Sequence, residues 1–249
     1  MNRVLLVFSA CCLLGTVAFA DSLGPPTAGL KTKQMSAGAE YFFEETNIEI
    51  SNSSLYNFFG QKSIKIKELE TNRIYIVLGY GLSDVWEVFL RLGSSDAKYE
   101  GEFRSIFEFA GGIGTKYTFI QDQTLPWGAL LQVSWHSAED DGVTVGELPF
   151  DTITGDVEIK WNEIKIVIGP TYNYSENMRF YGGLGVFLFD GEVEASDGVD
   201  KLDVNAEEES DFGGYFGAQY NLDENNVVNV EAQFTSNSWG IGAGIIWKF

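Results

Sequence analysis

The sequence has 249 residues and a mass of 27.6 kDa, and 45% of its residues are hydrophobic, which is enough for one large β-domain or two smaller ones. Residues 1–20 resemble a secretory signal peptide, because a short basic start and an apolar run lead to the small-x-small cleavage site Ala18-Phe19-Ala20. Removing Arg3 from the 16 basic residues leaves 15 against 36 acidic ones, a formal net charge of −21. This charge has the wrong sign for a nucleic-acid-binding protein, so no nucleic-acid partner is expected.

Both cysteines, Cys11 and Cys12, lie in the predicted signal peptide. A mature chain that begins near Asp21 therefore has no disulfide, no thiolate metal site and no cysteine nucleophile, and we expect no cofactor and no metal. Lipidation of Cys11 is the alternative interpretation, although Phe8-Ser9-Ala10 is a poor approach to such a site. After residue 20 no window approaches the roughly 18–20 apolar residues of a membrane helix, so a membrane role requires another architecture.

Residues 21–33 contain Pro25 and Pro26 without any periodicity, and they predict a short N-terminal leader. From residue 34 to 249, apolar and polar residues alternate with a period of two, which predicts β-strands in a single domain. The ten predicted strands cover residues 34–45, 72–82, 84–94, 105–120, 126–137, 156–174, 178–190, 210–222, 226–235 and 239–249. The alternation changes phase at Asn162-Glu163, which we interpret as a β-bulge, with a hairpin turn as the alternative.

The predicted connections alternate in length. Long connections are expected at roughly 46–71, 95–104, 138–155 and 191–209, and the connections between them are tight. The last hairpin, at Ser236-Asn237-Ser238, is the one short connection on the long-loop side. This alternation predicts an up-and-down antiparallel meander with its long loops at one end.

One face of the predicted strands is apolar and carries almost no charge. Aromatic residues lie at both ends of this face, which is the arrangement of the two interfacial girdles of a membrane barrel. Toward the tight turns they are Tyr80, Trp86, Phe119, Trp127, Tyr172, Phe180, Tyr220 and Phe249, and toward the long loops they are Phe43, Phe107, Trp135, Trp161, Phe212, Phe234 and Trp239. An exported soluble β-sandwich is the alternative, but its core aromatics would not sort by strand end.

The opposite face carries charges of both signs, which predicts a polar lumen. A charged side chain facing lipid at the bilayer midplane costs about 2–4 kcal/mol, so these residues are expected to point inward. The predicted lumen charge network is Glu40, Glu44, Arg73, Glu87, Arg91, Glu108, Lys116, Arg179, Glu231 and Lys248. Arg91 is expected to pair with Glu108, and Glu87 with Lys116.

With these features the chain resembles the small Gram-negative outer-membrane β-barrels of the OmpA, OmpX and OmpW type. The resemblance is architectural over the whole mature chain, and it is most specific in the closing segment 242–249. In that family a terminal Phe with a preceding hydrophobe and glycine is the signal for the barrel-assembly machinery, and Gly244, Trp247 and Phe249 match it. The resemblance implies an outer-membrane location, contact with outer-membrane lipids and lipopolysaccharide, and assembly by that machinery. The strand count departs from the family pattern, because its best-known members have eight strands.

Two features of the sequence are candidates for catalysis or metal binding. His136 shares its predicted inward face with Ser134, and Glu139, Asp140 and Asp141 follow, which leaves a lipid or peptide hydrolase as an alternative function. Segment 190–211 is strongly acidic, but it lacks the oxygen spacing and central glycine of a calcium loop. We interpret it as a solvated surface loop.

The sequence thus predicts an all-β transmembrane antiparallel barrel of ten strands, with eight as the fallback. A narrow or occluded lumen is expected, because Phe42, Tyr75, Phe89, Arg91, Phe187 and Tyr215 would line it. The expected function is a non-enzymatic envelope role, structural or in surface interaction, with acidic extracellular loops and a monomeric state favoured. A narrow channel for small polar solutes is the first alternative.

Overall fold

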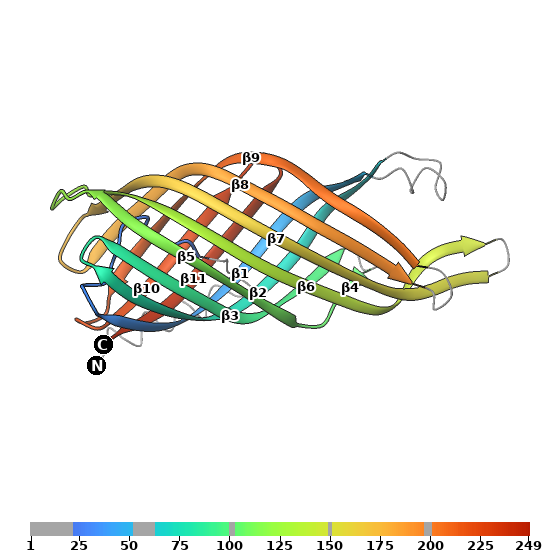
Figure 1. Cartoon of the computed structure of the whole chain (residues 1–249), viewed down its shortest axis with the longest axis horizontal. Coiled ribbons are helices and arrows are strands. Elements are labelled where there is room, and N and C mark those ends of the chain that lie inside the picture. The colour runs from blue at the N-terminus through green and yellow to red at the C-terminus, as the bar shows by residue number, and fades with distance from the viewer. Residues whose placement is uncertain (1–21, 52–62, 100–102, 149–150, 197–200) are drawn as a thin grey trace, which may run out of the picture.

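The computed structural model describes residues 22–51, 63–99, 103–148, 151–196 and 201–249, which form an antiparallel β-barrel (Figure 1). The strands are β1 (Met35–Ser51), β2 (Ser63–Ser83), β3 (Trp86–Tyr99), β4 (Phe103–Arg104), β5 (Glu108–Ile120), β6 (Trp127–Leu148), β7 (Asp151–Asn173), β8 (Met178–Ser196), β9 (Lys201–Asn221), β10 (Asn226–Phe234) and β11 (Ser238–Lys248). Ten of them form the wall, and β4 is a two-residue pairing at the end of β3. The predicted ten-stranded barrel is confirmed.

The ring closes between the first and last strands. Each wall strand pairs with its neighbours in the chain, and β1 pairs with β11 from Ser36 opposite Lys248 to Thr46 opposite Ser238. The main-chain groups of Met35 and Phe249 also hydrogen-bond to each other at 3.1 and 3.0 Å. Closure leaves no open sheet edge in the wall, as a barrel in hydrocarbon requires. No helix in the described ranges is long and apolar enough to cross a membrane.

All four predicted long connections are largely strand in the described residues. Strands β1, β6 and β8 continue to Ser51, Leu148 and Ser196, and β3 and β4 cover most of 95–104, so the expectation of loops over most of 46–71, 95–104, 138–155 and 191–209 is wrong. Apolar and charged residues still alternate in parts of these segments, as in Ile48-Glu49-Ile50 and Ile64-Lys65-Ile66-Lys67. The sequence therefore carried a strand signal there that the expectation of loops overlooked. The hairpins β1–β2, β6–β7 and β8–β9 rise at one end of the barrel, here named the hairpin end, and the opposite end is named the tight-turn end (Figure 1).

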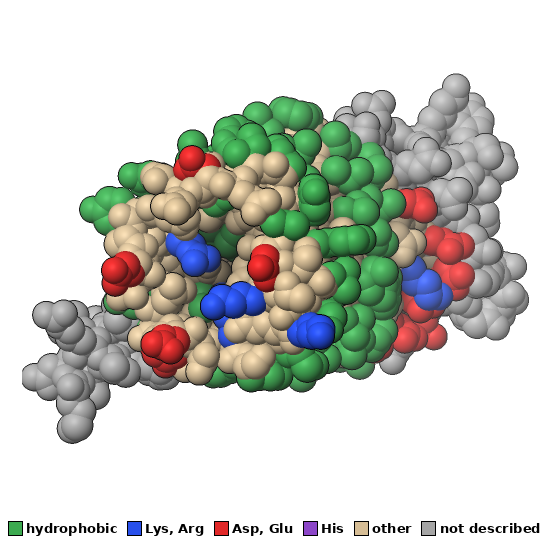
Figure 2. All heavy atoms as spheres, turned by 60° about the vertical axis from the view of Figure 1, so that its left-hand side comes forward, with side chains coloured by type: hydrophobic (Ala, Val, Ile, Leu, Met, Phe, Trp, Pro, Cys, Tyr) green, Lys and Arg blue, Asp and Glu red, His purple; other side chains and the backbone are tan. Residues whose placement is uncertain are grey.

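The outer wall is an apolar belt. Figure 2 shows hydrophobic side chains around the wall and charged side chains gathered at the two ends. All the predicted tight-turn aromatics are exposed on the wall, as are Phe107, Phe212, Phe234 and Trp239 toward the hairpin end. Exposure of Ile76, Phe216 and Ile113 to 62%, 62% and 53% of their surfaces is the pattern of a lipid-facing surface rather than of a soluble core.

Strand β7 contradicts two predictions. Its pairing with β6 runs from Ile159 to Pro170 without a register shift, so no bulge or turn exists at Asn162-Glu163. In this continuous strand the odd-numbered residues face inward, and Trp161 is buried in the lumen instead of contributing to the girdle. The apparent phase change arises because the lumen accepts two apolar side chains here, Ile159 and Trp161, before it becomes charged.

Candidate functional site

The candidate functional site is the interior of the barrel. Of the predicted network, Glu40, Arg73, Glu87, Arg91 and Glu231 are buried, and the other members occupy inward positions of their strands. The predicted lining residues Phe42, Tyr75, Phe89 and Tyr215 are also buried. The alternation along the strands therefore identified the inward row correctly, although it did not identify which charges contact each other.

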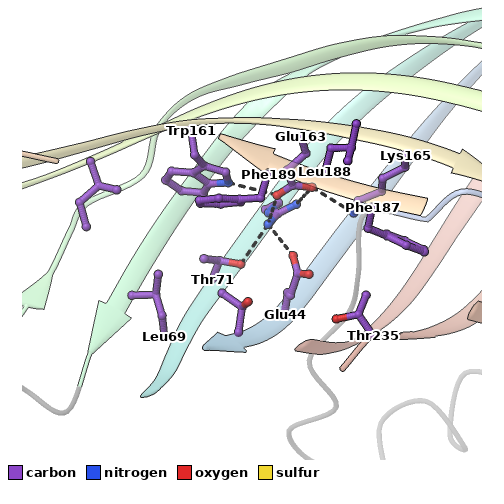
Figure 3. Close-up of a pocket in the computed structure, with 13 residues that line it drawn as sticks. Glu44, Leu69, Thr71, Trp161, Glu163, Lys165, Phe187, Leu188, Phe189 and Thr235 are labelled. Atoms are coloured by element: carbon purple, nitrogen blue, oxygen red, sulfur yellow. Dashed lines mark hydrogen bonds and ion pairs between the residues drawn. The ribbon is translucent and has the colours of Figure 1, made fainter. Parts of the chain in front are cut away.

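A cluster of charges crosses the lumen near the hairpin end (Figure 3). The guanidinium of Arg73 lies 2.6 Å from a carboxylate oxygen of Glu44 and 2.7 Å from one of Glu163. The ammonium of Lys165 lies 3.0 Å from Glu163. Phe42 lies beneath both cations, 4.9 Å from the Arg73 guanidinium and 5.1 Å from the Lys165 ammonium. These four charged residues form what we name the hairpin-side cluster, which is ionically balanced.

A small cavity lies beside this cluster. Its volume is about 40 Å³, which suffices for a water molecule but not for a solute with several heavy atoms. Apolar and hydroxyl side chains complete its wall (Figure 3); they are Thr46, Leu69, Thr71, Ile159, Trp161, Phe187, Leu188, Phe189 and Thr235. The lumen is therefore narrow at this level.

His136 lies under the cluster and is enclosed. Its ring stacks on Trp161 with centroids 4.9 Å apart, and its Nδ1 lies 3.2 Å from the hydroxyl of Tyr75. Its Nε2 lies 3.7 Å from Glu163. The hydroxyl of Ser134 accepts a hydrogen bond from Gln132 at 3.0 Å. Direct Ser-His contact, which a hydrolytic dyad needs, is not among these contacts.

Arg91 occupies the centre of the lumen. It lies 3.2 Å from Glu40 and also donates to the side-chain oxygen of Gln132. The predicted partner Glu108 lies instead opposite Ser95 on the neighbouring strand, while Arg91 lies opposite Gly112. The prediction of an Arg91–Glu108 pair is wrong, because the two residues are offset by four positions along the ladder.

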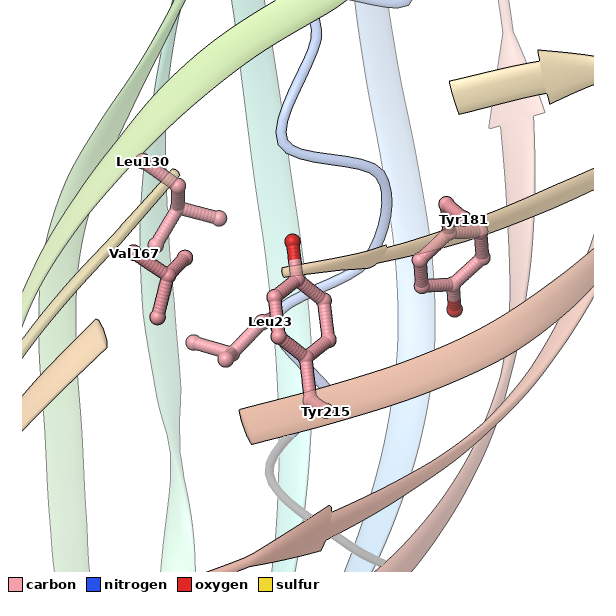
Figure 4. Close-up of a cluster of buried hydrophobic side chains, with 5 residues drawn as sticks. All are labelled: Leu23, Leu130, Val167, Tyr181 and Tyr215. Atoms are coloured by element: carbon pink, nitrogen blue, oxygen red, sulfur yellow. The ribbon is translucent and has the colours of Figure 1, made fainter. Parts of the chain in front are cut away.

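The N-terminal segment lies inside the barrel, which the sequence did not predict. Residues 22–33 enter the lumen from the tight-turn end, and we name them the N-terminal plug. Ser22, Leu23 and Leu30 are buried in it, with exposures of 1%, 0% and 4%. Leu23 packs among four inward side chains of the wall (Figure 4), which are Leu130, Val167, Tyr181 and Tyr215.

Two carboxylates of the wall bind the main chain of the plug. Glu231 accepts hydrogen bonds from the backbone N–H groups of Leu23 and Gly24 at 2.9 and 2.8 Å. Glu87 accepts from the N–H groups of Gly29 and Leu30 at 2.8 and 3.2 Å. Each carboxylate thus makes charge-assisted bonds to two consecutive peptide groups.

Cations of the wall bind the carbonyl groups of the plug. Arg91 donates to the backbone oxygen of Ser22, and the Lys248 ammonium donates to that of Gly29 at 3.1 Å. Lys116 lies opposite Glu87 in the ladder, and the Glu87 carboxylate binds the main chain of the plug. The predicted lumen network is therefore in part a binding site for the chain's own N-terminus.

Glu163 and Lys165 are absent from the predicted lumen network, because a bulge predicted at Asn162-Glu163 interrupted the inward row there. A signal was present, since Glu163 and Lys165 alternate with Ile164, Ile166 and Ile168 in one unbroken phase. No hydropathy signal identified the plug, because its buried apolar residues Leu23, Pro25, Pro26 and Leu30 follow no regular period.

The residues predicted as an assembly signal lie at the closing seam. Trp247 and Phe249 are exposed on the outer wall at the tight-turn end. Gly244 lies opposite Glu40 across the β1–β11 seam, where a Cβ atom would lie 2.9 Å from the Glu40 side chain. A residue without a side chain at position 244 therefore makes room for Glu40 to reach Arg91.

The sequence matches no protein-family profile and no curated protein. The fold is similar to solved outer-membrane barrels. The outer membrane protease OmpT of Escherichia coli has a TM-score of 0.53 and 12% identity, over 92% of this chain and 100% of that chain. OprG of Pseudomonas aeruginosa has a TM-score of 0.40 and 11% identity over 89% and 98%, and Ail of Yersinia pestis has 0.33 and 12% over 88% and 99%. The closed antiparallel ring and the similarity to OmpT together show the fold of an outer-membrane β-barrel.

Proposed function

We propose that the protein is a non-conducting outer-membrane barrel of a diderm bacterium, with a structural or surface-interaction role carried by its hairpin end. The observation that carries this proposal is the occupation of the lumen at every level. The hairpin-side cluster, the central Arg91–Glu40 pair and the N-terminal plug lie in series along the barrel. Buried side chains at each level leave little room for a hydrated solute.

The orientation follows from the connections. In outer-membrane barrels short turns face the periplasm and long excursions face the outside, so we place the tight-turn end in the periplasm. The hairpins β1–β2, β6–β7 and β8–β9 would then stand above the outer leaflet. The acidic segment 190–211 of the β8–β9 hairpin would contact anionic lipopolysaccharide through divalent cations. The protein would be a monomer, with its outer wall in contact with lipid.

The biogenesis proposal rests on the closing strand. Gly244, Trp247 and Phe249 end the strand that pairs with β1, and this position supports recognition by the barrel-assembly machinery after export. The OmpA, OmpX and OmpW resemblance remains a proposal about ancestry, since the ring has ten strands where those barrels have eight.

Planar-bilayer recording on the refolded chain 21–249 tests the function. We expect no single-channel steps from protein that shows the gel mobility of a folded barrel. Steady currents that fall in Arg91→Trp or Lys116→Trp variants would instead support the narrow channel. Lipid hydrolysis assayed in parallel and abolished by His136→Ala would support the hydrolase; we expect no turnover, because His136 is enclosed and has 0% side-chain exposure.

A further inference from the structure

We propose that the tight-turn half of the lumen is a binding site for a peptide segment, and that the N-terminal plug is an exchangeable ligand attached in cis. This inference goes beyond the proposed function, because peptide exchange does not require conduction. The site faces the periplasm in the orientation given above. Its ligand class is a peptide with a buried leucine followed by glycine, proline and small residues, and a second leucine near the mouth.

Recognition falls mainly on the main chain of the plug. Besides the bonds to Glu231, Glu87, Arg91 and Lys248, the hydroxyl of Thr118 accepts from the N–H of Ala28 at 2.9 Å. Main-chain groups are common to every peptide, so these contacts fix the path and direction of the backbone rather than most of its side chains. Gly24 is an exception, because its φ of 67° favours glycine. Carboxylates meet N–H groups and cations meet carbonyl groups, which is the polarity that a peptide backbone needs.

Shape supplies the second argument. A Cβ atom on Gly128 would lie 2.4 Å from the backbone oxygen of Pro26, and one on Gly81 would lie 2.0 Å from that of Lys31. Both contacts are too short for a side chain, so the wall is hollowed by glycine where the plug backbone passes. The two glycines belong to β6 and β2, on different sides of the plug.

Side-chain selection is strongest at Leu23, which is fully buried, and Leu30 and Thr27 are also buried. Leu23 fills the pocket formed by Leu130, Val167, Tyr181 and Tyr215 (Figure 4), whereas Lys31 and Lys33 are exposed at the mouth. Loss of this burial should weaken binding at least about tenfold, since complete burial of a leucine side chain is strongly favourable. The same position therefore controls both the cis plug and a peptide supplied in trans.

The experiment uses the full-length processed chain and a synthetic peptide of residues 21–33 with a fluorophore on Lys33. A tethered ligand has an effective concentration on the order of millimolar, so the wild-type barrel should not bind micromolar peptide. A Leu23→Asp barrel has a weakened cis plug and an unchanged wall, and it should bind the peptide saturably. The Leu23→Asp peptide should bind this barrel at least about tenfold more weakly, and addition of Gly128→Val to the barrel should abolish binding.

Equal binding of both peptides to the Leu23→Asp barrel, or no binding to the folded variant, would overturn the proposal. If Leu23→Asp does not fold, Leu23→Ser replaces it, and hydrogen exchange on the wild type gives an independent readout. The amides of Leu23, Gly24 and Gly29 should then exchange well before those of the wall strands. Exchange as slow as that of the wall would show a fixed plug and contradict the inference, while the absence of conductance would still stand.

Discussion

Glu163 has the most demanding electrostatic position of any residue in the hairpin-side cluster. Its carboxylate contacts Arg73 and Lys165, and it also accepts a hydrogen bond from the indole N–H of Trp161 at 3.1 Å. Removing one partner of a buried ion pair leaves an uncompensated charge, whereas the intact pair adds little net stability. The role of Glu163 is therefore best tested by neutralising it.

Glu163→Gln should lower the free energy of unfolding by about 3–5 kcal/mol, because two buried cations lose their shared counter-charge. Denaturant unfolding in detergent, followed by the gel mobility of the folded barrel, measures this change. Glu158→Gln is the matched control, since Glu158 pairs with Lys160 at the surface and such pairs contribute about 0–1 kcal/mol. Equal stability of the two variants would show that the cluster does not depend on Glu163.

At the scale of elements, the N-terminal plug is tethered where it leaves the lumen. Asp84, in the turn between β2 and β3, accepts hydrogen bonds from the backbone N–H and the hydroxyl of Thr32 at 2.8 and 2.7 Å. The pKa of Asp84 lies below its ordinary value of 3.8, mainly because the backbone N–H of Thr32 donates a hydrogen bond to the carboxylate; the bond from the Thr32 hydroxyl is the second cause. A carboxyl with a lowered pKa stabilises the folded state above its unfolded pKa and loses this contribution as the pH falls through the folded value.

The thermal midpoints of wild type and Asp84→Ala should therefore differ by a constant amount above about pH 4, near the ordinary pKa of an aspartate. The difference should shrink below pH 3.8, as Asp84 of the wild type becomes protonated. Asp84→Asn, which keeps an acceptor oxygen without a titrating charge, is the control and should show no such shrinkage relative to Asp84→Ala. A wild-type difference that stays constant down to pH 2, about two units below the ordinary pKa, would contradict the tether.

The wall elements were predictable because a lipid-facing row and a polar row impose a period of two. Outside the membrane this constraint ends, so the upper parts of β6 and β7 were mistaken for loop although their ladder continues to Leu148 opposite Asp151. The prediction that Trp161 faces lipid failed, because the inward row of β7 holds aromatic as well as charged side chains. Contacts such as Glu231 with Leu23 join positions 208 residues apart and have no local signature at all.

At the scale of the whole molecule, an apolar belt surrounds a lumen that is blocked at successive levels by the hairpin-side cluster, the Arg91–Glu40 pair and the N-terminal plug. The lipid bilayer requires an apolar belt with aromatic residues at its two interfaces, and this pattern identified the membrane barrel from the sequence. The closure depends on the N-terminal plug, whose polar contacts are matched by the wall at Glu231, Glu87, Arg91 and Lys248. The inward side chains of a ten-stranded ring do not fill its interior completely, and the plug occupies the remaining space.

The most direct test of this account is a disulfide between the plug and the wall. The hydroxyls of Thr27 and Thr171 lie 2.8 Å apart, and the chain after residue 20 has no cysteine. Thr27→Cys with Thr171→Cys should therefore oxidise rapidly in the folded barrel, while Thr27→Cys with Tyr172→Cys, whose second thiol faces lipid, should not. Equal and slow oxidation of the two pairs in folded protein would show that residues 22–33 do not lie inside the barrel.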